Sequence, residues 1–338
     1  MSRAQNNREA TLRKLLMAAA SAIAVLGGCA VAQVKAQTQD YPTRTITLIV
    51  PFPAGGGVDA VGRIVAEKLS AALGQQVIVD NRGGAAGVLG TRVAAKAAPD
   101  GYTLVMSHTG TTAINPTLYA NPGYDPRKDF SPVGLISATP IVLMAHPSFP
   151  GKTIADVVVL AKKEPGKLNL GTPPAGTGGY LAGELFKATA GIDATLVRYN
   201  GTAQLTNDLI AGHVPLGFNV MAPAMGNLQA GNLRAIAVLG ATRTSLLPDV
   251  PTAIESGLPG FEAMLHYGLM VPAGTPRAIV ERLNKELRAL VNSDAVTQRI
   301  HADGGDPLTS TPEEYAKDID REETKWSALI KKLNLKVE

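Results

Sequence analysis

The sequence predicts an α/β protein made of two lobes that are joined by crossing strands. Strand-like and helix-like segments alternate along the chain, they do so in two successive sets, and two apolar segments are long enough to run between the sets. The 338 residues are 45% hydrophobic and 18% charged, which is typical of a globular protein with two domains. Because aromatic residues make up only 4%, we expect an aliphatic core.

The first set occupies residues 43–107. An alternating and then wholly apolar stretch at 43–52 predicts a strand that enters a buried sheet. The apolar positions of 58–74 fall on one face of a helix that ends at Gly74. A strand at 75–82, a glycine loop, a helix at 91–98 and a strand at 102–107 follow. Strands that alternate with helices in this way indicate a parallel sheet.

The second set begins after an apolar segment at 133–147, which is the first predicted crossing. Helices at 153–166, 180–191 and 202–212 alternate with strands at 167–172, 194–199, 214–220 and 233–240. The second crossing, 261–272, precedes two long amphipathic helices at 279–292 and 312–333. We therefore predict one lobe from residues 37–138 and 260–338, and a second lobe from residues 139–259.

Residues 1–36 have the pattern of a secretory signal peptide. Four basic residues precede an apolar run of about 14 residues, which is shorter than the roughly 20 that a membrane-spanning helix needs. Small residues are compatible with cleavage after Ala32 or after Ala36, and Leu26 to Cys29 also resembles a lipobox whose cysteine would be acylated. Cleavage after an alanine predicts a protein free in the periplasm, whereas acylation predicts a lipid anchor through Cys29.

The charge and the cysteine content exclude several classes of protein. The chain carries 32 basic and 28 acidic residues, and residues 1–36 hold five of the former and one of the latter, which leaves 27 of each. A neutral mature chain gives no support to nucleic-acid binding. Cys29 is the single cysteine, which excludes intrachain disulfides and thiolate metal sites. The five histidines are scattered along the sequence, and we expect no metal site.

The first candidate site is the glycine-rich loop 51–59, between a predicted strand and a predicted helix. Glycines allow main-chain N–H groups to face a ligand, and the positive end of the helix dipole favours an anion. The loop matches neither a Walker loop nor the dinucleotide-binding fingerprint. Asp59 is consistent either with a helix cap or with a residue on the ligand side.

The loop 171–179 occupies the corresponding position in the second set. Thr172 and Thr177 add hydroxyl groups, so we expect two helix N-termini from different lobes to close on a carboxylate without a buried lysine or arginine. The alternative is a pair of ordinary strand-to-helix turns. Polar residues also follow other strands, at 107–110, 199–201 and 218–219, where ligands of open α/β sheets bind.

The sequence contains no constellation for catalysis. A G-x-S-x-G elbow is absent, and Ser107 beside His108 is a pair of neighbours without the geometry of a triad. We therefore predict a binding protein and not an enzyme, and we expect no cofactor.

Nine stretches in register carry a resemblance to a known family: YPTRTITLIVPFPAGGGVDAVGR, LGQQVIVDNRGGAAGVLG, APDGYTLVM, NPTLY, YDPRKDFSPVGLI, EPGKLNLGT, LAGELFK, LPDVPTAIESGLPGFEA and VPAGTPRAIVERLN. They resemble the Bug family, the solute receptors of tripartite tricarboxylate transporters, from about Tyr41 to Trp326. The resemblance implies a two-lobe periplasmic-binding-protein type II fold of the α/β class with hinge-crossing strands. It also implies a periplasmic receptor that binds a small carboxylate and docks on the membrane subunits of a transporter. We expect this receptor to be a monomer.

In such a fold the ligand carboxylate is held by two loops and by the ends of later strands. The residues that correspond here are Phe52, Ala54, Gly55, Gly56, Asp59, Ser107, His108, Thr109, Thr172, Gly176, Thr177, Gly178, Tyr199, Asn200, Gly201, Phe218 and Asn219. Family ligands include dicarboxylates, tricarboxylates, amino acids and aromatic carboxylates. Phe218, Met221 and Met225 suit an apolar or aromatic ring.

Three departures from the family pattern bear on the ligand. Tyr180 stands where many relatives have histidine, Asn200 where many have lysine, and Asn219 where many have aspartate. The lost lysine and aspartate weaken the expectation of a tricarboxylate and of a ligand with an amino group. Two other functions share the binding step: a receptor that docks on a membrane sensor kinase, and a hydrolase, which would need a nucleophile and a base.

Overall fold

The computed structural model describes residues 41–302 and 304–337, and the described residues from Arg44 onward form one compact unit. The predicted signal peptide and Cys29 lie outside the described residues.

The first elements are β1 (Ile46–Val50), α2 (Gly57–Leu73), β2 (Val77–Asn81), η1 (Ala85–Gly87), α3 (Val88–Ala95), β3 (Thr103–His108), η2 (Gly110–Ile114), α4 (Asn115–Leu118) and β4 (Phe130–Ala145). The next are α5 (Ile154–Lys163), β5 (Asn169–Thr172), α6 (Gly178–Ala190), β6 (Thr195–Arg198), α7 (Thr202–Ile210), β7 (Leu216–Val220), α8 (Met225–Gln229) and β8 (Arg234–Val238). The last are β9 (Met264–Pro272), α9 (Arg277–Val291), α10 (Asp294–Ala302), β10 (Asp306–Pro307) and α11 (Pro312–Lys332).

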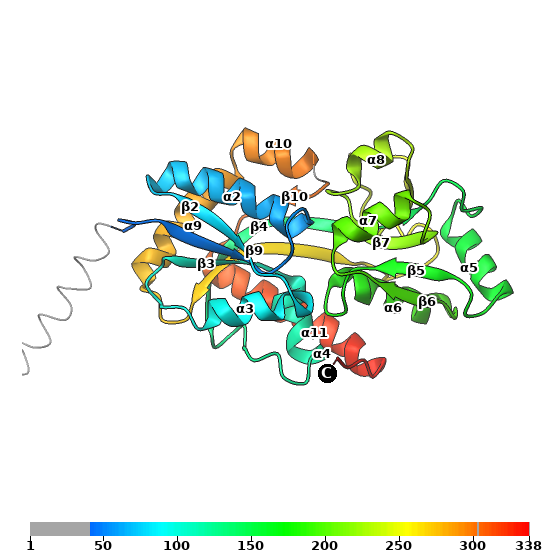
Figure 1. Ribbon diagram of the computed structural model, residues 1–338, viewed down its shortest axis with the longest axis horizontal. Helices are drawn as coiled ribbons and strands as arrows, with labels where there is room; N and C mark the ends of the chain where they lie inside the picture. Colours follow the sequence, from blue (N-terminus) through cyan, green and yellow to red (C-terminus); the bar gives the residue numbers. More distant parts are fainter. Residues whose placement is uncertain (1–40, 303, 338) are drawn as a thin grey trace, which may run out of the picture. The chain divides into compact units, whose positions relative to one another are not determined.

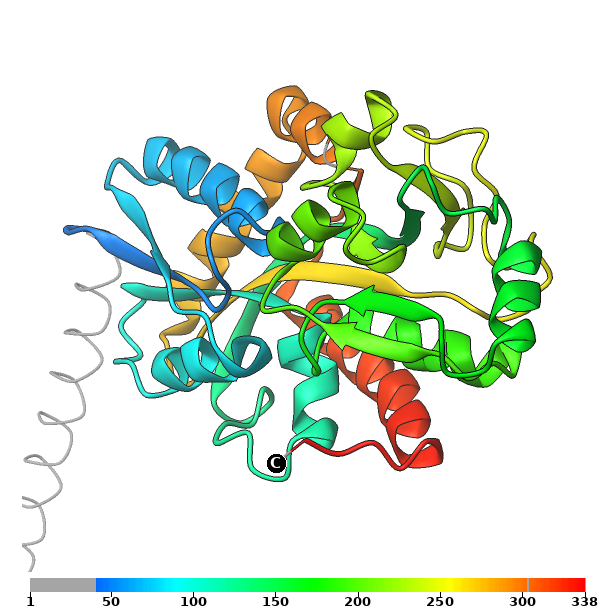
Figure 2. The same cartoon turned by 45° about the vertical axis from the view of Figure 1, so that its right-hand side comes forward.

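The strands lie in the order β2-β1-β3-β9-β4-β7-β5-β6, and β8 and β10 pair with β4. The strands β2, β1 and β3 at one end are parallel, as are β7, β5 and β6 at the other, whereas β9 and β4 are antiparallel to their neighbours. β4 pairs with β9 along Phe130 to Pro140 and with β7 along Ile141 to Ala145. We call the part of the sheet with β1, β2 and β3 the first half and the part with β5, β6 and β7 the second half. β4 therefore passes from the first half to the second, and β9, yellow in Figure 2, runs beside it. Both predicted crossing segments are confirmed.

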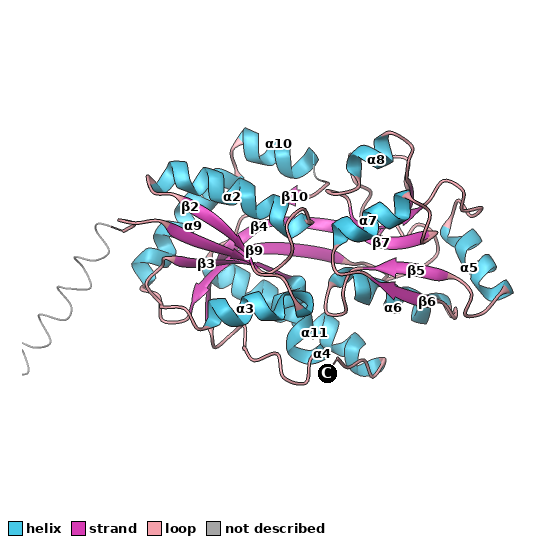
Figure 3. Cartoon of the chain, in the orientation of Figure 1, coloured by secondary structure: helices cyan, strands magenta, loops and turns pink. Residues whose placement is uncertain are grey.

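Helices cover both faces of the first half (Figures 1 and 3). On one face α2 packs so closely that a Cβ at Gly62 would lie 2.9 Å from Val50 and 3.3 Å from Met106. On the other face Ile49 and Val105 share a core with residues of α3 and α11. Successive residues of a strand point to opposite faces, and so β1 needs apolar side chains at successive positions from Leu48 to Val50, where it is fully buried. This accounts for the wholly apolar stretch in the sequence.

The second half repeats this arrangement with different helices. Phe186 of α6 packs against Phe218 of β7 on one face, with 5.6 Å between the ring centroids. On the opposite face Leu205 and Leu209 of α7 pack against Val142 of β4 in a separate core. The two halves are therefore each a sheet between helices, as predicted from the alternation of elements.

Helix boundaries follow the capping signals in the sequence. α2 and α6 end at Gly74 and Gly191, which have positive φ of 69° and 60°, as expected for C-terminal glycines. The two long amphipathic helices are confirmed as α9 and α11, the second of which begins with a Thr311–Glu314 capping box. α3 begins at Val88, earlier than predicted, and α8 and α10 were not predicted, because such short helices have weak periodicity.

Candidate functional site

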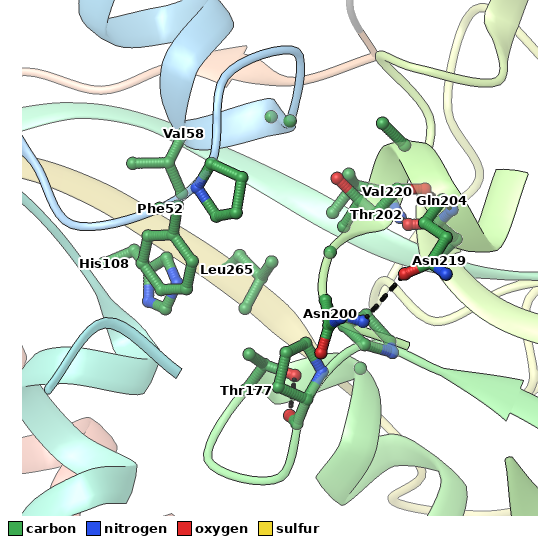
Figure 4. A pocket seen from close by; sticks show the side chains of 18 of the residues that line it. Phe52, Val58, His108, Thr177, Asn200, Thr202, Gln204, Asn219, Val220 and Leu265 are labelled. Atoms are coloured by element: carbon green, nitrogen blue, oxygen red, sulfur yellow. Dashed lines mark hydrogen bonds between the residues drawn. The ribbon is translucent and has the colours of Figure 1, made fainter. Parts of the chain in front are cut away.

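A cavity of about 300 Å³ is lined by residues from both halves. Figure 4 shows Phe52, Val58 and His108 on one side of it and Thr202 and Gln204 across from them. Eight of the predicted binding residues line it: Phe52, Ala54, Gly56, His108, Thr177, Asn200, Gly201 and Asn219. The volume is at the lower end of the range for ligand pockets, about 300 to 1,000 Å³, and therefore suits a small molecule.

Three helices begin at this cavity. Its lining includes Gly57 of α2, Gly179 of α6 and Thr202 of α7, each within the first two residues of its helix. The N-cap residues of α2 and α7 are Gly56 and Gly201, and neither has a side chain that caps the helix. The first N–H groups of a helix have no intrahelical acceptor, and the dipole gives its N-terminus about half a positive charge. The cavity is therefore suited to an anion.

Asp59 braces the loop that leads into α2. Its carboxylate accepts hydrogen bonds from the Gly55 N–H (2.9 Å), the Arg63 Nε (3.0 Å) and the Asn81 Nδ2 (2.9 Å). Burial alone would raise the pKa of Asp59, but the hydrogen bonds from Arg63, Gly55 and Asn81 outweigh it and hold the pKa below its usual value. Asp59 is the third residue of α2 and not its N-cap, and its side chain does not line the cavity. Asp59 therefore stabilises the loop that lines the cavity without lining the cavity itself.

His108 and two aromatic rings form one wall of the cavity. Its ring stacks on Phe52 at 4.5 Å between centroids and meets Tyr267 edge-on at 6.2 Å. Its Nδ1 accepts the Gly110 N–H at 2.7 Å, which assigns the proton of the neutral ring to Nε2. Desolvation by burial lowers the pKa of His108 to about 4, so the side chain is uncharged at neutral pH. His108 therefore adds no charge to the wall of the cavity.

The low pKa of His108 predicts a pH-dependent stability. The unfolded chain binds a proton near pH 6.5 and the folded chain near pH 4, so this contribution is complete above about 6.5 and is lost as pH falls toward 4. At pH about 5.5 we expect the unfolding free energy to be about 1 kcal/mol lower than at pH about 7.5 on account of this residue. Urea denaturation of the wild type and of His108→Gln at both pH values measures it. Equal pH dependence in the two proteins would show that His108 is not buried as a neutral ring.

The opposite wall carries uncharged polar groups. Asn219 donates from Nδ2 to the Thr202 carbonyl (3.1 Å) and to Thr206 Oγ1 (2.9 Å), which fixes the start of α7. Gln204 Oε1 accepts the Asn200 N–H at 3.2 Å. Among the described residues that line the cavity there is no Lys, Arg, Asp or Glu. An anion bound there would be held by main-chain dipoles and neutral donors only.

Nine predicted binding residues lie outside the lining: Gly55, Asp59, Ser107, Thr109, Thr172, Gly176, Gly178, Tyr199 and Phe218. Strand alternation explains part of this, because His108 faces the cavity and its neighbours face away. Ser107 Oγ lies 3.0 Å from the Gly268 carbonyl and 2.7 Å from the Tyr315 hydroxyl, and Thr109 Oγ1 accepts the N–H of His266 at 2.9 Å.

The apolar part of the lining differs from the prediction. Phe218, Met221 and Met225 are buried in the cores of the second half and do not contact the cavity. Of the apolar side chains that line it, Pro53, Val58, Pro173 and Pro174 belong to the two predicted loops, although they were not singled out there. Ile141, Val220 and Leu265 lie outside every predicted site. Ile141 belongs to β4 and Leu265 to β9. The two predicted crossing segments were therefore the signal from which these two lining residues could have been found.

Thr177 supports α6 rather than offering a free hydroxyl. Its Oγ1 donates to the Pro174 carbonyl at 2.8 Å and accepts the Tyr180 N–H at 3.4 Å as the N-cap of the helix. We expect Thr177→Ala to lower the unfolding free energy by about 1 kcal/mol, whereas Thr177→Ser should retain the cap. Urea denaturation of both variants tests this. A fully stable Thr177→Ala with weakened ligand binding would instead assign the hydroxyl to the ligand.

Two further features of the described residues concern membranes and metals. In that part of the chain no helix combines the length and the apolar character needed to cross a membrane. Among the same residues, no three His, Cys, Asp or Glu side chains are grouped so as to hold a metal ion.

Comparison with known proteins identifies the family of this chain. Residues 61–335 match the family described as tripartite tricarboxylate transporter family receptor. The chain is 33% identical to the protein BugT of Bordetella pertussis over 298 residues, which cover 88% of this chain and 91% of BugT.

Two solved structures with ligands are also similar. R. palustris Rpa4515 with adipate is 35% identical, with a TM-score of 0.84 over 86% of this chain and 97% of the other. MatC (Rpa3494) from Rhodopseudomonas palustris with bound malate is 32% identical, with a TM-score of 0.81 over 86% of this chain and 100% of the other. The likeness confirms the two-lobe periplasmic-binding-protein fold. The chain belongs to the tripartite tricarboxylate transporter receptor family, to which the Bug proteins also belong.

Proposed function

We propose that this protein captures a small carboxylate in the periplasm and delivers it to the membrane subunits of a tripartite tricarboxylate transporter. The observation that carries the proposal is the meeting of three helix N-termini, two of them without a side-chain cap, at one cavity whose described lining residues carry no Lys, Arg, Asp or Glu side chain. Such a site stabilises a bound anion through main-chain N–H groups whose positions are fixed before the ligand binds. The family description supports delivery to a transporter over delivery to a sensor kinase.

The ligand class follows from the lining. Main-chain N–H groups supply the polar contacts to a carboxylate, while Ile141, Val220 and Leu265 supply an apolar surface for the body of the ligand. The related structures with adipate and malate support a dicarboxylate, and the Phe52–His108 wall supports an aromatic carboxylate as well. None of the described lining residues has a carboxylate that would pair with an ammonium group, so amino acids are poor candidates.

Capture proceeds by closure of two lobes without a covalent step. In this proposal residues 37–138 and 260–338 form one lobe and residues 139–259 the other, and β4 and β9 connect them. The carboxylate binds first to the loop of one lobe, and docking of the second lobe excludes water.

We further propose that the receptor acts as a monomer and that signal-peptide cleavage leaves it in the periplasm, tethered there if Cys29 is acylated.

A thermal-shift panel of adipate, malate, benzoate and glutamate tests the proposal. A ligand at 100 times its dissociation constant adds about 2.7 kcal/mol to the unfolding free energy, which raises the melting temperature. We expect one or more of the first three to raise it, and glutamate to leave it unchanged. No shift with any of them at millimolar concentration would contradict carboxylate capture.

A further inference from the structure

The loop before α6 is held from outside the cavity by a tyrosine of the other half. The Tyr119 hydroxyl, just after α4, donates to the Ala175 carbonyl at 3.1 Å. In the lobe division proposed above, Tyr119 belongs to the first lobe and Ala175 to the second. The bond therefore joins the two lobes at a point next to the ligand site.

Glycines make a close approach of the two main chains possible at this point. Gly176 has a φ of +96°, and a Cβ there would lie 2.4 Å from Asn115 Oδ1 and 2.9 Å from Tyr119 Cε2. From the other side, a Cβ at Gly110 would lie 2.8 Å from the Gly176 carbonyl oxygen. Neither position has room for a larger residue, because its neighbours are main chain or side chains that are at least partly buried.

The contact flanks the ligand cavity and does not line it. Pro174 and Thr177 line the cavity, whereas Ala175 and Gly176 between them face Tyr119 and Asn115. A change at Tyr119 can therefore affect the position of the loop without removing an atom that faces the ligand.

We propose that Tyr119 is a positioning residue, which latches the loop 173–177 to the first lobe and so sets the fraction of molecules in the closed, binding-competent form. The proposal rests on the proposed function, because it concerns the same site. The apparent dissociation constant of a receptor equals its intrinsic value divided by the competent fraction. A bond that exists only in the closed form therefore strengthens the binding of every ligand by the same factor.

The test compares Tyr119→Phe with Tyr124→Phe. Tyr124 is the matched control, because its hydroxyl also donates to a main-chain carbonyl, that of Thr111 at 2.7 Å, but within the first lobe. For each of adipate, malate and benzoate that binds the wild type, we expect Tyr119→Phe to raise the dissociation constant by the same factor, about three- to tenfold. Stopped-flow measurements should show a faster dissociation rate. Tyr124→Phe should lower the melting temperature and leave affinity within about twofold.

A ligand-independent measurement separates the latch from the proposed function. Spin labels at Lys96→Cys and Lys163→Cys, two exposed sites in different lobes, report the distance between lobes in a Cys29→Ser background. We expect Tyr119→Phe to shift the ligand-free distribution toward longer distances and Tyr124→Phe to leave it unchanged.

The outcomes are distinct for the two proposals. If the wild type binds none of the carboxylates, the proposed function fails and the distance distributions alone decide the latch. Unchanged distances in Tyr119→Phe would overturn the latch, as would equal effects of the two variants or a loss of affinity for one ligand only.

Discussion

Replacing Leu265 with Asp should abolish carboxylate binding. Leu265 lies in the lining, on the crossing strand β9, and its side chain is 7% exposed. A fixed carboxylate there would lie in the same cavity as the three helix N-termini, next to the start of α6, and these would favour its ionised form. Two unit charges about 4 Å apart repel by about 4 kcal/mol at an effective dielectric constant of about 20, so we expect affinity to fall roughly 1,000-fold at pH about 8.

Leu265→Asn is the matched control, because it has the same shape without the charge. We expect the Asn variant to bind within about tenfold of the wild type, since it loses only apolar contact. Isothermal titration with adipate, malate and benzoate measures both variants. Affinity of the Asp variant should recover as pH falls and its carboxyl takes up a proton. Equal affinities of the two variants at pH about 8 would mean that the anion is bound elsewhere.

Replacing Gly56 with Val should weaken binding by about 30- to 100-fold. Gly56 is the N-cap of α2 and lines the cavity, and a Cβ there would lie 3.1 Å from Thr202 Oγ1 at the start of α7. A branched side chain would therefore separate two of the helix N-termini and cover main-chain N–H groups that the ligand needs. The φ of Gly56 is −89°, which other residues adopt readily, so backbone strain is not the cause.

Gly226→Val supplies the control for that substitution. Gly226 lies in α8, does not line the cavity, and has open space where its Cβ would be. We expect its affinity to equal that of the wild type. The two variants should be compared by titration after circular dichroism has shown that both are folded. Wild-type affinity in a folded Gly56→Val would remove this loop from the site.

The fold could be predicted to the extent that it depends on local patterns. The apolar stretch at β1 and the glycines that end α2 and α6 report buried strands and helix ends directly. The order of strands could not be read in this way, because the pairing of β3 with β9 joins segments about 160 residues apart. The path of β4 across both halves was predicted from its length alone.

The candidate site was predictable at the level of its loops and not of each side chain. The two glycine-rich loops were identified because strand, glycine and helix follow each other in the sequence, and both supply residues to the cavity. Thr202 and Gln204 were missed, because nothing in the start of α7 distinguishes it from an ordinary helix. Ser107 was assigned to the site because it ends a strand, but the alternation along β3 turns it toward Tyr315.

A crystal structure with a bound carboxylate from the panel tests the central claim most directly. We expect the carboxylate oxygens to lie within about 3 Å of main-chain nitrogens at the starts of α2, α6 or α7, with no charged side chain in contact. A carboxylate that is held by an arginine or lysine, or that lies outside the cavity between Phe52 and Thr202, would contradict the account.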